Sequence, residues 1–166
     1  MIRELFARLE RELAEACRRV YRDRLVTVAV FGSVGRGTPS PGSDLDVLIV
    51  ARDLPRGRMK RIAEFQQVEE ALEPFIEAMS REGIDTYVAP VFKTPEEVES
   101  GSLLFLDMIG DAHIPYVRSG YFRGHLDRLA ARLGELGARK VKSGGSWHWV
   151  LKPDLRPGEV FDLWKT

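Results

Sequence analysis

Cysteine is almost absent from this sequence, and asparagine does not occur in it at all. The single cysteine, Cys17, excludes an intramolecular disulfide and a zinc site built from several thiolates. It falls on the apolar stripe of a predicted helix, which favours a buried and inert thiol. The only side-chain amides are those of Gln66 and Gln67, and such a shortage of thermolabile amides is typical of a thermophile.

The sequence also lacks an excess of charge of either sign and any long apolar run. It holds 25 basic and 25 acidic residues, so the strongly basic footprint of a general nucleic-acid binder is missing. Its apolar runs are too short to span a bilayer. The opening segment, MIRELFARLE, is charged and helical, so no signal peptide is predicted and we expect a cytoplasmic protein.

The composition is that of a globular protein. Hydrophobic residues make up 44% and charged residues 30% of the 166 positions, which excludes a chain that is disordered throughout. This length predicts one domain over residues 1–166. Apolar residues that recur every three or four positions predict an N-terminal helix at about 2–22, and residues from about 138–166 form an aromatic-rich C-terminal extension.

One stretch, residues 26–50, organises the rest of the chain. The apolar run 26–31 predicts a strand, and the glycine-rich turn FGSVGRG breaks it. Two prolines and a further glycine keep the connection irregular. Residues 45–50 then predict a second apolar strand in which one acid, Asp46, is embedded.

Two carboxylates, Asp44 and Asp46, open that second strand. Residues i and i+2 of a strand face the same side, so the two side chains project together. At a separation of about 6 Å they would repel by about 3 kcal/mol at an effective dielectric constant of about 20. Such a pair predicts a cation between the carboxylates, and Mg²⁺ suits it because it takes carboxylate, water and phosphate oxygens.

The glycine turn predicts phosphate binding beside that cation. Backbone N–H groups after Gly32, at the start of a short helix, can cradle phosphate oxygens. Ser33 adds a hydroxyl group, and Arg36 adds a cation that can bind phosphate through two N–H groups. Each feature alone is common in structural turns, but their conjunction favours a site for a charged ligand.

The stretch FGSVGRG followed by SDLDVLIV resembles the nucleotidyltransferase superfamily that includes DNA polymerase beta, and within it the minimal nucleotidyltransferases, the MNT antitoxin-like group. The resemblance covers residues 26–50 and extends loosely to about residue 92. It implies an α/β (α+β) nucleotidyltransferase fold, with a small mixed β-sheet and helices packed mainly on one face. It further implies nucleotide-binding and metal-binding roles for the residues that match its motif: Gly32, Ser33, Arg36, Gly37, Ser43, Asp44 and Asp46.

The family pattern adds a third carboxylate on a later strand. Residues 84–92, IDTYVAPVF, predict that strand, and Asp85 stands near its start. By its position alone, an Asp at a strand edge is more often structural. The resemblance implies that Asp85 completes the catalytic and metal-binding group and accepts the proton of the attacking hydroxyl, with Asp107 and Asp111 as the alternatives.

The resemblance implies nucleotidyl transfer. A nucleoside triphosphate, expected to be ATP, would place its phosphates over Ser33 and Arg36, and two Mg²⁺ ions about 3.5–4 Å apart would bridge the carboxylates and the α-phosphate. An acceptor hydroxyl would attack the α-phosphorus and pyrophosphate would leave. Catalysis would come mostly from positioning and charge neutralisation.

Three hypotheses for the acceptor stay open. Proteins of this group commonly act as antitoxins that add AMP to a tyrosine of a small helical partner of the HEPN family, and this is the first hypothesis. The second is a stand-alone transferase acting on RNA ends or a small molecule. The third is a binding module that neutralises its partner by contact alone, against which the intact carboxylates Asp44, Asp46 and Asp85 argue.

All three tryptophans lie in the C-terminal extension, at Trp147, Trp149 and Trp164. The sequence WHWVLK predicts a strand with Trp147 and Trp149 on one face. Core packing is one interpretation of these side chains. A surface for a partner protein or a nucleobase is the other, because aromatic residues dominate binding hot spots.

Overall fold

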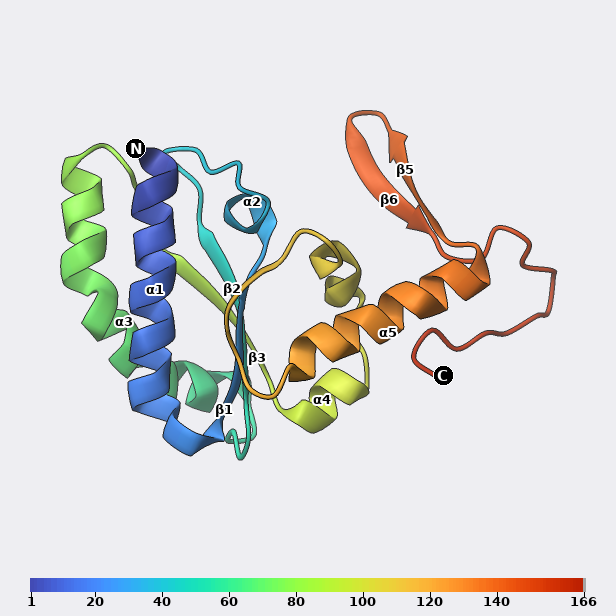
Figure 1. Cartoon of the computed structure of the whole chain (residues 1–166), viewed down its shortest axis with the longest axis horizontal. Coiled ribbons are helices and arrows are strands. Elements are labelled where there is room, and N and C mark those ends of the chain that lie inside the picture. The colour runs from blue at the N-terminus through green and yellow to red at the C-terminus, as the bar shows by residue number, and fades with distance from the viewer. Residues whose placement is uncertain (166) are drawn as a thin grey trace.

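A four-stranded mixed sheet forms the centre of the computed structural model, which describes residues 1–165. Its strand order is β3-β2-β1-β4 (Figure 1). Strand β1 runs antiparallel to β2 and to β4, whereas β2 and β3 are parallel. The mixed α+β sheet implied by the resemblance is therefore confirmed, with strands β1 (Leu25–Val30), β2 (Leu45–Ala51), β3 (Val88–Lys93) and β4 (His113–Val117).

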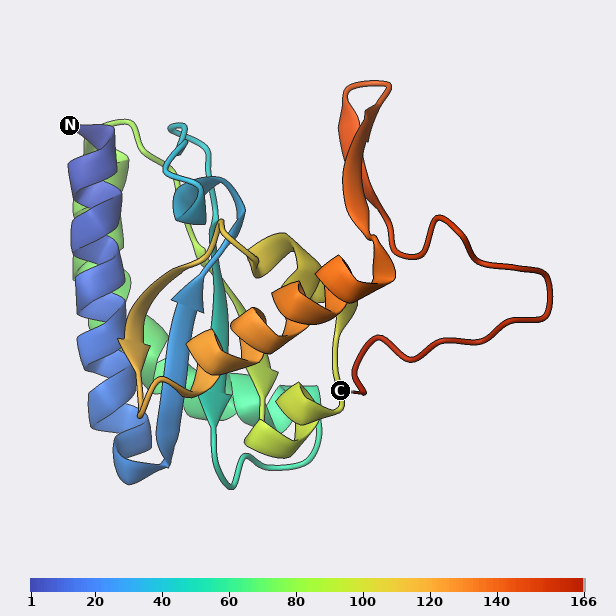
Figure 2. The ribbon, with the colours of Figure 1, turned by 45° about the vertical axis from the view of Figure 1, so that its right-hand side comes forward.

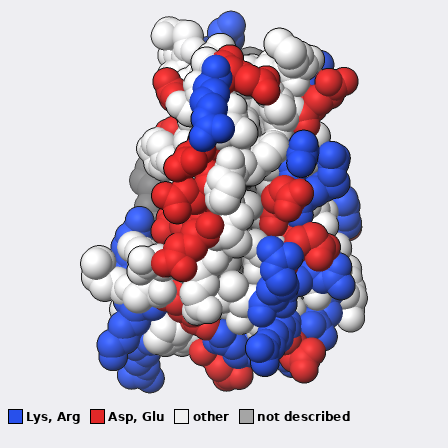
Figure 3. Space-filling view, turned by 90° about the vertical axis from the view of Figure 1, so that its left-hand side faces the viewer, with Lys and Arg blue, Asp and Glu red and all other residues white. Residues whose placement is uncertain are grey.

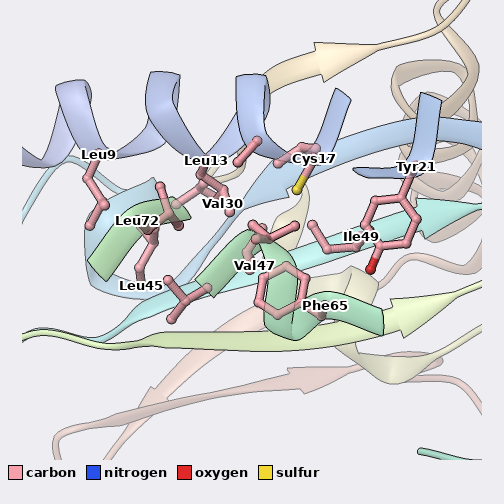
Figure 4. Close-up of a cluster of buried hydrophobic side chains, with 14 of the residues drawn as sticks. Leu9, Leu13, Cys17, Tyr21, Val30, Leu45, Val47, Ile49, Phe65 and Leu72 are labelled. Atoms are coloured by element: carbon pink, nitrogen blue, oxygen red, sulfur yellow. The ribbon is translucent and has the colours of Figure 1, made fainter. Parts of the chain in front are cut away.

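Two long helices, α1 (Ile2–Tyr21) and α3 (Arg58–Arg81), cover one face of the sheet. The apolar stripe of α1 meets alternate side chains of β1 and β2, because a helix repeats every 3.6 residues and a strand every two. Figure 4 shows the resulting core, in which Leu13, Val47 and Phe65 are fully buried. Cys17 lies in the same core and its burial raises the pKa of the thiol, so the prediction of a buried cysteine is confirmed.

The two longest helices share one face, as the resemblance implies, and shorter helices also cover the opposite face. In Figure 1 the sheet is seen nearly edge-on, with α1 and α3 to its left and the helices labelled α4 and α5 to its right. All six residues of β1 are buried, because the side chains on both of its faces are apolar and each face needs a cover. The cover comes from α4 (Pro95–Glu99), the 3₁₀ helix η2 (Leu103–Met108) and α5 (Tyr121–Leu136).

Strand β3 begins later than the sequence predicts. The backbone N–H of Asp85 donates to the carbonyl of Pro41 at 2.9 Å, outside the ladder, and regular pairing with β2 starts at Val88. The parallel ladder then places Val88 beside Leu45 and Ala89 beside Asp46. Pro74 does not split α3, which continues from Arg58 to Arg81.

The aromatic-rich C-terminal residues form a hairpin and a return segment. Strands β5 (Arg139–Ser143) and β6 (Ser146–Val150) pair with each other and with no strand of the main sheet. In Figures 1 and 2 the chain then loops outward and comes back. On its return, the Trp164 ring lies 6.3 Å from that of Phe105. This contact joins the end of the chain to the buried apolar cluster between the sheet and α5, which we call the second core.

The solvent side of the two long helices carries charges of both signs (Figure 3). Three glutamates of α3, Glu69, Glu70 and Glu73, are exposed and lie on its solvated face. Among the described residues, no helix combines the length and the apolar character needed to cross a membrane.

One ion pair joins α3 to the N-terminus of α4. Two N–H groups of the Arg61 guanidinium donate to the two carboxylate oxygens of Glu97, each at 2.8 Å. Glu97 also closes a capping box with Thr94, because it accepts from the Thr94 N–H at 3.0 Å while the Thr94 hydroxyl accepts from the Glu97 N–H at 3.2 Å. Arg61 is the first cause of the lowered pKa of Glu97.

We expect Glu97→Ala to lower the free energy of unfolding by about 2–3 kcal/mol, because it removes the cap and leaves the Arg61 side chain, 12% exposed, without its partner. Glu97→Gln should cost less, since a glutamine still closes the box. Urea denaturation of both, with the exposed neighbour Glu96→Ala as control, measures this. A group with a lowered pKa stabilises the fold above its unfolded pKa, so the Glu97→Gln deficit must shrink in acid; a deficit that grows there would contradict this account.

Candidate functional site

The glycine-rich turn forms a one-turn helix, α2 (Gly32–Gly35), directly after β1. The first N–H groups of a helix have no partner within it, and here they lie at Gly32, Ser33 and Val34. The chain then closes on itself, because the N–H of Thr38 donates to the carbonyl of Ser33 at 2.9 Å. The turn thus presents backbone donors beside the start of β2, as the sequence predicts.

The glycine-rich turn passes close to the side chain of Asp46. The N–H of Phe31 donates to the carbonyl of Asp46 at 3.0 Å, which fixes the turn against β2. A Cβ atom added to Gly32 would lie 2.3 Å from Oδ2 of Asp46, and Gly32 has a φ of +66°. Only glycine therefore fits at this position, for reasons of both backbone conformation and space.

The carboxylates of Asp44 and Asp46 are close enough to affect each other. The pKa of Asp46 is raised, first by burial and then by the negative charge of Asp44, while Arg36 opposes the rise. The predicted pairing of these two side chains at the start of β2 therefore has an electrostatic signature. Two carboxylates that repel each other fit a bound divalent cation, which would relieve the repulsion and take both as oxygen ligands.

A cleft of about 570 Å³ opens in front of Asp46, large enough for a nucleotide-sized ligand. We call it the Asp46 cleft. Its walls come from the α2 turn, from β2, from the segment that includes η2, and from the β5–β6 hairpin: Phe31, Gly32, Arg36, Asp46, Leu104, Asp107, Asp111, Lys140 and Trp147. Gly32, Arg36 and Asp46 thus share one cleft with Asp107 and Asp111, the two alternatives for the third carboxylate.

The serines of the loop are bonded to one another. The hydroxyl of Ser33 donates to that of Ser43 at 3.0 Å, and Ser43 also accepts from the N–H of Ser40 at 2.8 Å. Ser43 is buried. Its hydroxyl therefore holds the irregular connection in shape and fixes the side chain of Ser33. Gly37 lies further out and is exposed.

Asp85 does not join the carboxylate pair in the structure. It is exposed, lies three residues before β3, and accepts a hydrogen bond from the Ser80 hydroxyl at 2.8 Å. Within residues 1–165, no three His, Cys, Asp or Glu side chains form a group that could hold a metal ion. The role of Asp85 as the third carboxylate stays a prediction.

Tyr87 stands beside Asp44 instead. The N–H of Leu45 donates to the carbonyl of Tyr87 at 2.9 Å, which sets Asp44 and Tyr87 side by side. The Asp44 carboxylate is the first cause of the raised pKa of Tyr87. Strand alternation over 85, 87 and 89 would have indicated this residue, had the parallel pairing been known.

Two further residues of the cleft, Lys140 and Trp147, lie far from the Gly32–Asp46 stretch in the sequence. Lys140 lies 4.0 Å from Asp111 and carried no signal in the sequence. Trp147 was expected either in the core or on a binding surface, and it is 59% exposed in the wall of the Asp46 cleft. Packing against the second core brings the hairpin to this place, and no local motif could have shown it.

Comparison with known proteins identifies the unit that builds this site. The family model described as nucleotidyltransferase domain matches residues 10–99, more than half of the chain. A curated protein of Methanocaldococcus jannaschii named "Putative protein adenylyltransferase MJ1305" is 27% identical over 120 residues, which cover 71% of this chain and 76% of that protein.

Solved structures share the fold at low sequence identity. A chain from a toxin-antitoxin with AMP-PNP aligns with a TM-score of 0.50 and 17% identity, covering 77% of this chain and 92% of its own. One from a tri-AMPylated Shewanella oneidensis HEPN toxin in complex with MNT antitoxin gives 0.50 and 15%, covering 79% and 88%. Spectinomycin adenyltransferase AAD(9) from Enterococcus faecialis, with ATP and spectinomycin, gives 0.53 and 12%, covering 78% and 66%.

We expect Asp46→Asn to raise the melting temperature without divalent cations by about 2–4 °C, the shift that about 1 kcal/mol produces in a chain of this size. A carboxyl whose pKa is raised by folding destabilises the fold once it is ionised, so the gain should appear at neutral pH and vanish in acid. Thermal unfolding measured across pH tests this. An unchanged or lower melting temperature at neutral pH would contradict the electrostatic interpretation.

Gly32→Ala should abolish the rise in melting temperature that Mg²⁺ gives the wild type, because the new methyl group displaces the Asp46 carboxylate. Gly37→Ala is the matched control. Gly37 has a φ of +74° with nothing within 4 Å of an added Cβ, so it carries the backbone strain, about 1–2 kcal/mol, without the collision. Equal responses to Mg²⁺ in the two variants would refute the close-approach argument.

Proposed function

The chain belongs to the nucleotidyltransferase domain family, and on that premise we propose that it is a Mg²⁺-dependent enzyme that transfers AMP from ATP to a tyrosine hydroxyl of a HEPN-type protein partner. The observation that carries the proposal is the contact between the α2 turn and Asp46 within one cleft. Phosphate-binding donors and a repelling carboxylate pair are the two parts that nucleotidyl transfer needs side by side.

In the proposed reaction, this chain binds and aligns the triphosphate. The first-turn N–H groups of α2 and the Arg36 guanidinium would bind phosphate oxygens. Asp44 and Asp46 would hold magnesium, which supplies charge neutralisation at phosphorus when bound. The acceptor oxygen forms a bond to the α-phosphorus, the bond to the bridging oxygen of pyrophosphate breaks, and a carboxylate takes the proton of the hydroxyl.

Two arguments favour different residues for the carboxylate that takes the proton. The family motif points to Asp85, which the structure places at the hydroxyl of Ser80. The shared cleft points to Asp107 and Asp111, which lie in the same walls as Asp46. Since these three residues come from different segments, single substitutions can separate them.

The similar proteins support a protein acceptor. The curated relative is named as a protein adenylyltransferase, and two fold neighbours come from toxin-antitoxin structures, one holding AMP-PNP and one a tri-AMPylated HEPN toxin. A small-molecule acceptor is the second candidate, because the same fold occurs in spectinomycin adenyltransferase. Neutralisation by contact alone is disfavoured, since such a module would not need the close approach of Gly32 to the partly buried, ionisable Asp46.

The test is intact-mass spectrometry of a candidate HEPN partner, the product of the adjacent gene, incubated with this protein, Mg²⁺ and each nucleoside triphosphate in turn. We expect a mass gain of one or more AMP units with ATP. Asp46→Asn should slow the transfer by roughly a thousandfold, because the loss of a metal ligand removes several kcal/mol of charge stabilisation.

Asp53→Asn is the matched control, since it makes the same change at an exposed position after the far end of β2. Transfer that survives in Asp46→Asn would sink the metal assignment. No mass gain despite a tight complex would favour neutralisation by contact, and neither gain nor complex would move the search to RNA and small-molecule acceptors. Asp85→Asn, Asp107→Asn and Asp111→Asn, compared in the same assay, identify the third carboxylate by the largest loss.

A further inference from the structure

One face of the β5–β6 hairpin combines cations with aromatic rings. In the antiparallel ladder Lys140 pairs with Trp149 and Lys142 pairs with Trp147. Directly paired residues project on the same side of a sheet, and positions two apart do so as well. All four side chains therefore share one face of the hairpin.

That face is turned toward the Asp46 cleft. Lys140 and Trp147 line the cleft together with Gly32, Arg36 and Asp46. Figures 1 and 2 show the hairpin rising from the end of α5 toward the end of the molecule where α2 lies. The hairpin lies outside residues 10–99, the part matched by the family model, so the shared motif does not account for it.

The two tryptophans have different surroundings. Trp149 is half-buried against the second core, which anchors the hairpin to the body of the protein. Trp147 keeps 59% of its surface exposed, with the Lys142 ammonium 5.9 Å from the centre of its ring. An anchored hairpin that holds a largely exposed indole at the rim of a cleft presents a flat aromatic surface to a ligand.

The cleft changes in character from one wall to another. Arg36, Asp46 and the α2 turn supply the phosphate and metal chemistry, whereas Leu104 and Trp147 supply apolar surface. The ammonium group of Lys140 lies 4.0 Å from the carboxylate of Asp111 and adds a cation to the cleft. A ligand with phosphates at one end and a planar aromatic ring at the other matches this distribution.

We propose that Trp147 stacks on the nucleobase of the bound nucleoside triphosphate and that Lys140 contacts its phosphates, so that the β5–β6 hairpin completes the nucleotide site. The inference rests on the proposed function, whose site it extends. Stacking of a base on an aromatic side chain is worth about 1–3 kcal/mol by alanine substitution, enough to affect affinity strongly.

The test measures binding of two Mg²⁺-loaded probes by titration calorimetry. One is ATP with a methylene bridge between its α- and β-phosphates, and the other is inorganic tripolyphosphate, which has no base. Trp147→Ala should weaken binding of the ATP analogue about tenfold and leave tripolyphosphate binding unchanged. Lys140→Gln should weaken binding of both probes, because it acts on the phosphates.

Two variants control the measurement. Trp147→Phe keeps an aromatic face, so it should retain most of the affinity for the ATP analogue. If the hairpin lost its structure instead, that affinity would fall. Val160→Ala, at a 91% exposed position in the same C-terminal segment, should change nothing. Circular dichroism and melting temperature verify that each variant is folded.

The outcomes separate this inference from the proposed function. If Trp147→Ala leaves binding of the ATP analogue unchanged, or weakens both probes equally, the base platform is refuted while the transferase site stands. An unchanged affinity combined with weaker capture of the HEPN partner would assign Trp147 to a protein interface instead. If the wild type binds neither probe in the presence of Mg²⁺, the proposed function itself fails.

Discussion

The antiparallel pairing of β1 with β2 is the constraint on which the whole site depends. Because the N–H of Phe31 bonds to the carbonyl of Asp46, the chain that leaves β1 must pass directly over the Asp46 side chain. A left-handed glycine is the residue that allows this passage, and the turn that follows presents its free N–H groups beside the carboxylate. One backbone contact therefore brings together the two parts of the site that we propose bind phosphate and metal.

The same contact has an electrostatic cost that a ligand can relieve. Burial beneath the turn and the nearby charge of Asp44 both oppose ionisation of Asp46, and Arg36 compensates only in part. A divalent cation with its phosphate ligands would neutralise the pair. Under the proposed function, the empty site would be less favourable than the loaded one, a trade between stability and function that is common at active sites. The surrounding cores, built on both faces of β1 and β2, supply the stability that tolerates it.

The cleft is built from two parts of the chain, one within the family match and one after it. The unit shared with the family, residues 10–99, contributes the α2 turn, Asp44 and Asp46, and strands β1 to β3. The segment after it closes the cleft from the other side with Asp107, Asp111, Lys140 and Trp147.

The sequence by itself determined the local geometry of the site. The two-residue period of a strand places Asp44 and Asp46 together, the glycine spacing marks the turn, and the helical period defines the buried stripes of α1 and α3; each needs only neighbours within a few positions. Tertiary structure alone decided what surrounds these residues. It set Tyr87 beside Asp44 through the parallel pairing of β3, covered the second face of the sheet, and brought Lys140 and Trp147 into the cleft. These contacts join residues more than a hundred positions apart, and they arise from packing of whole elements, which leaves no periodic signal in the sequence.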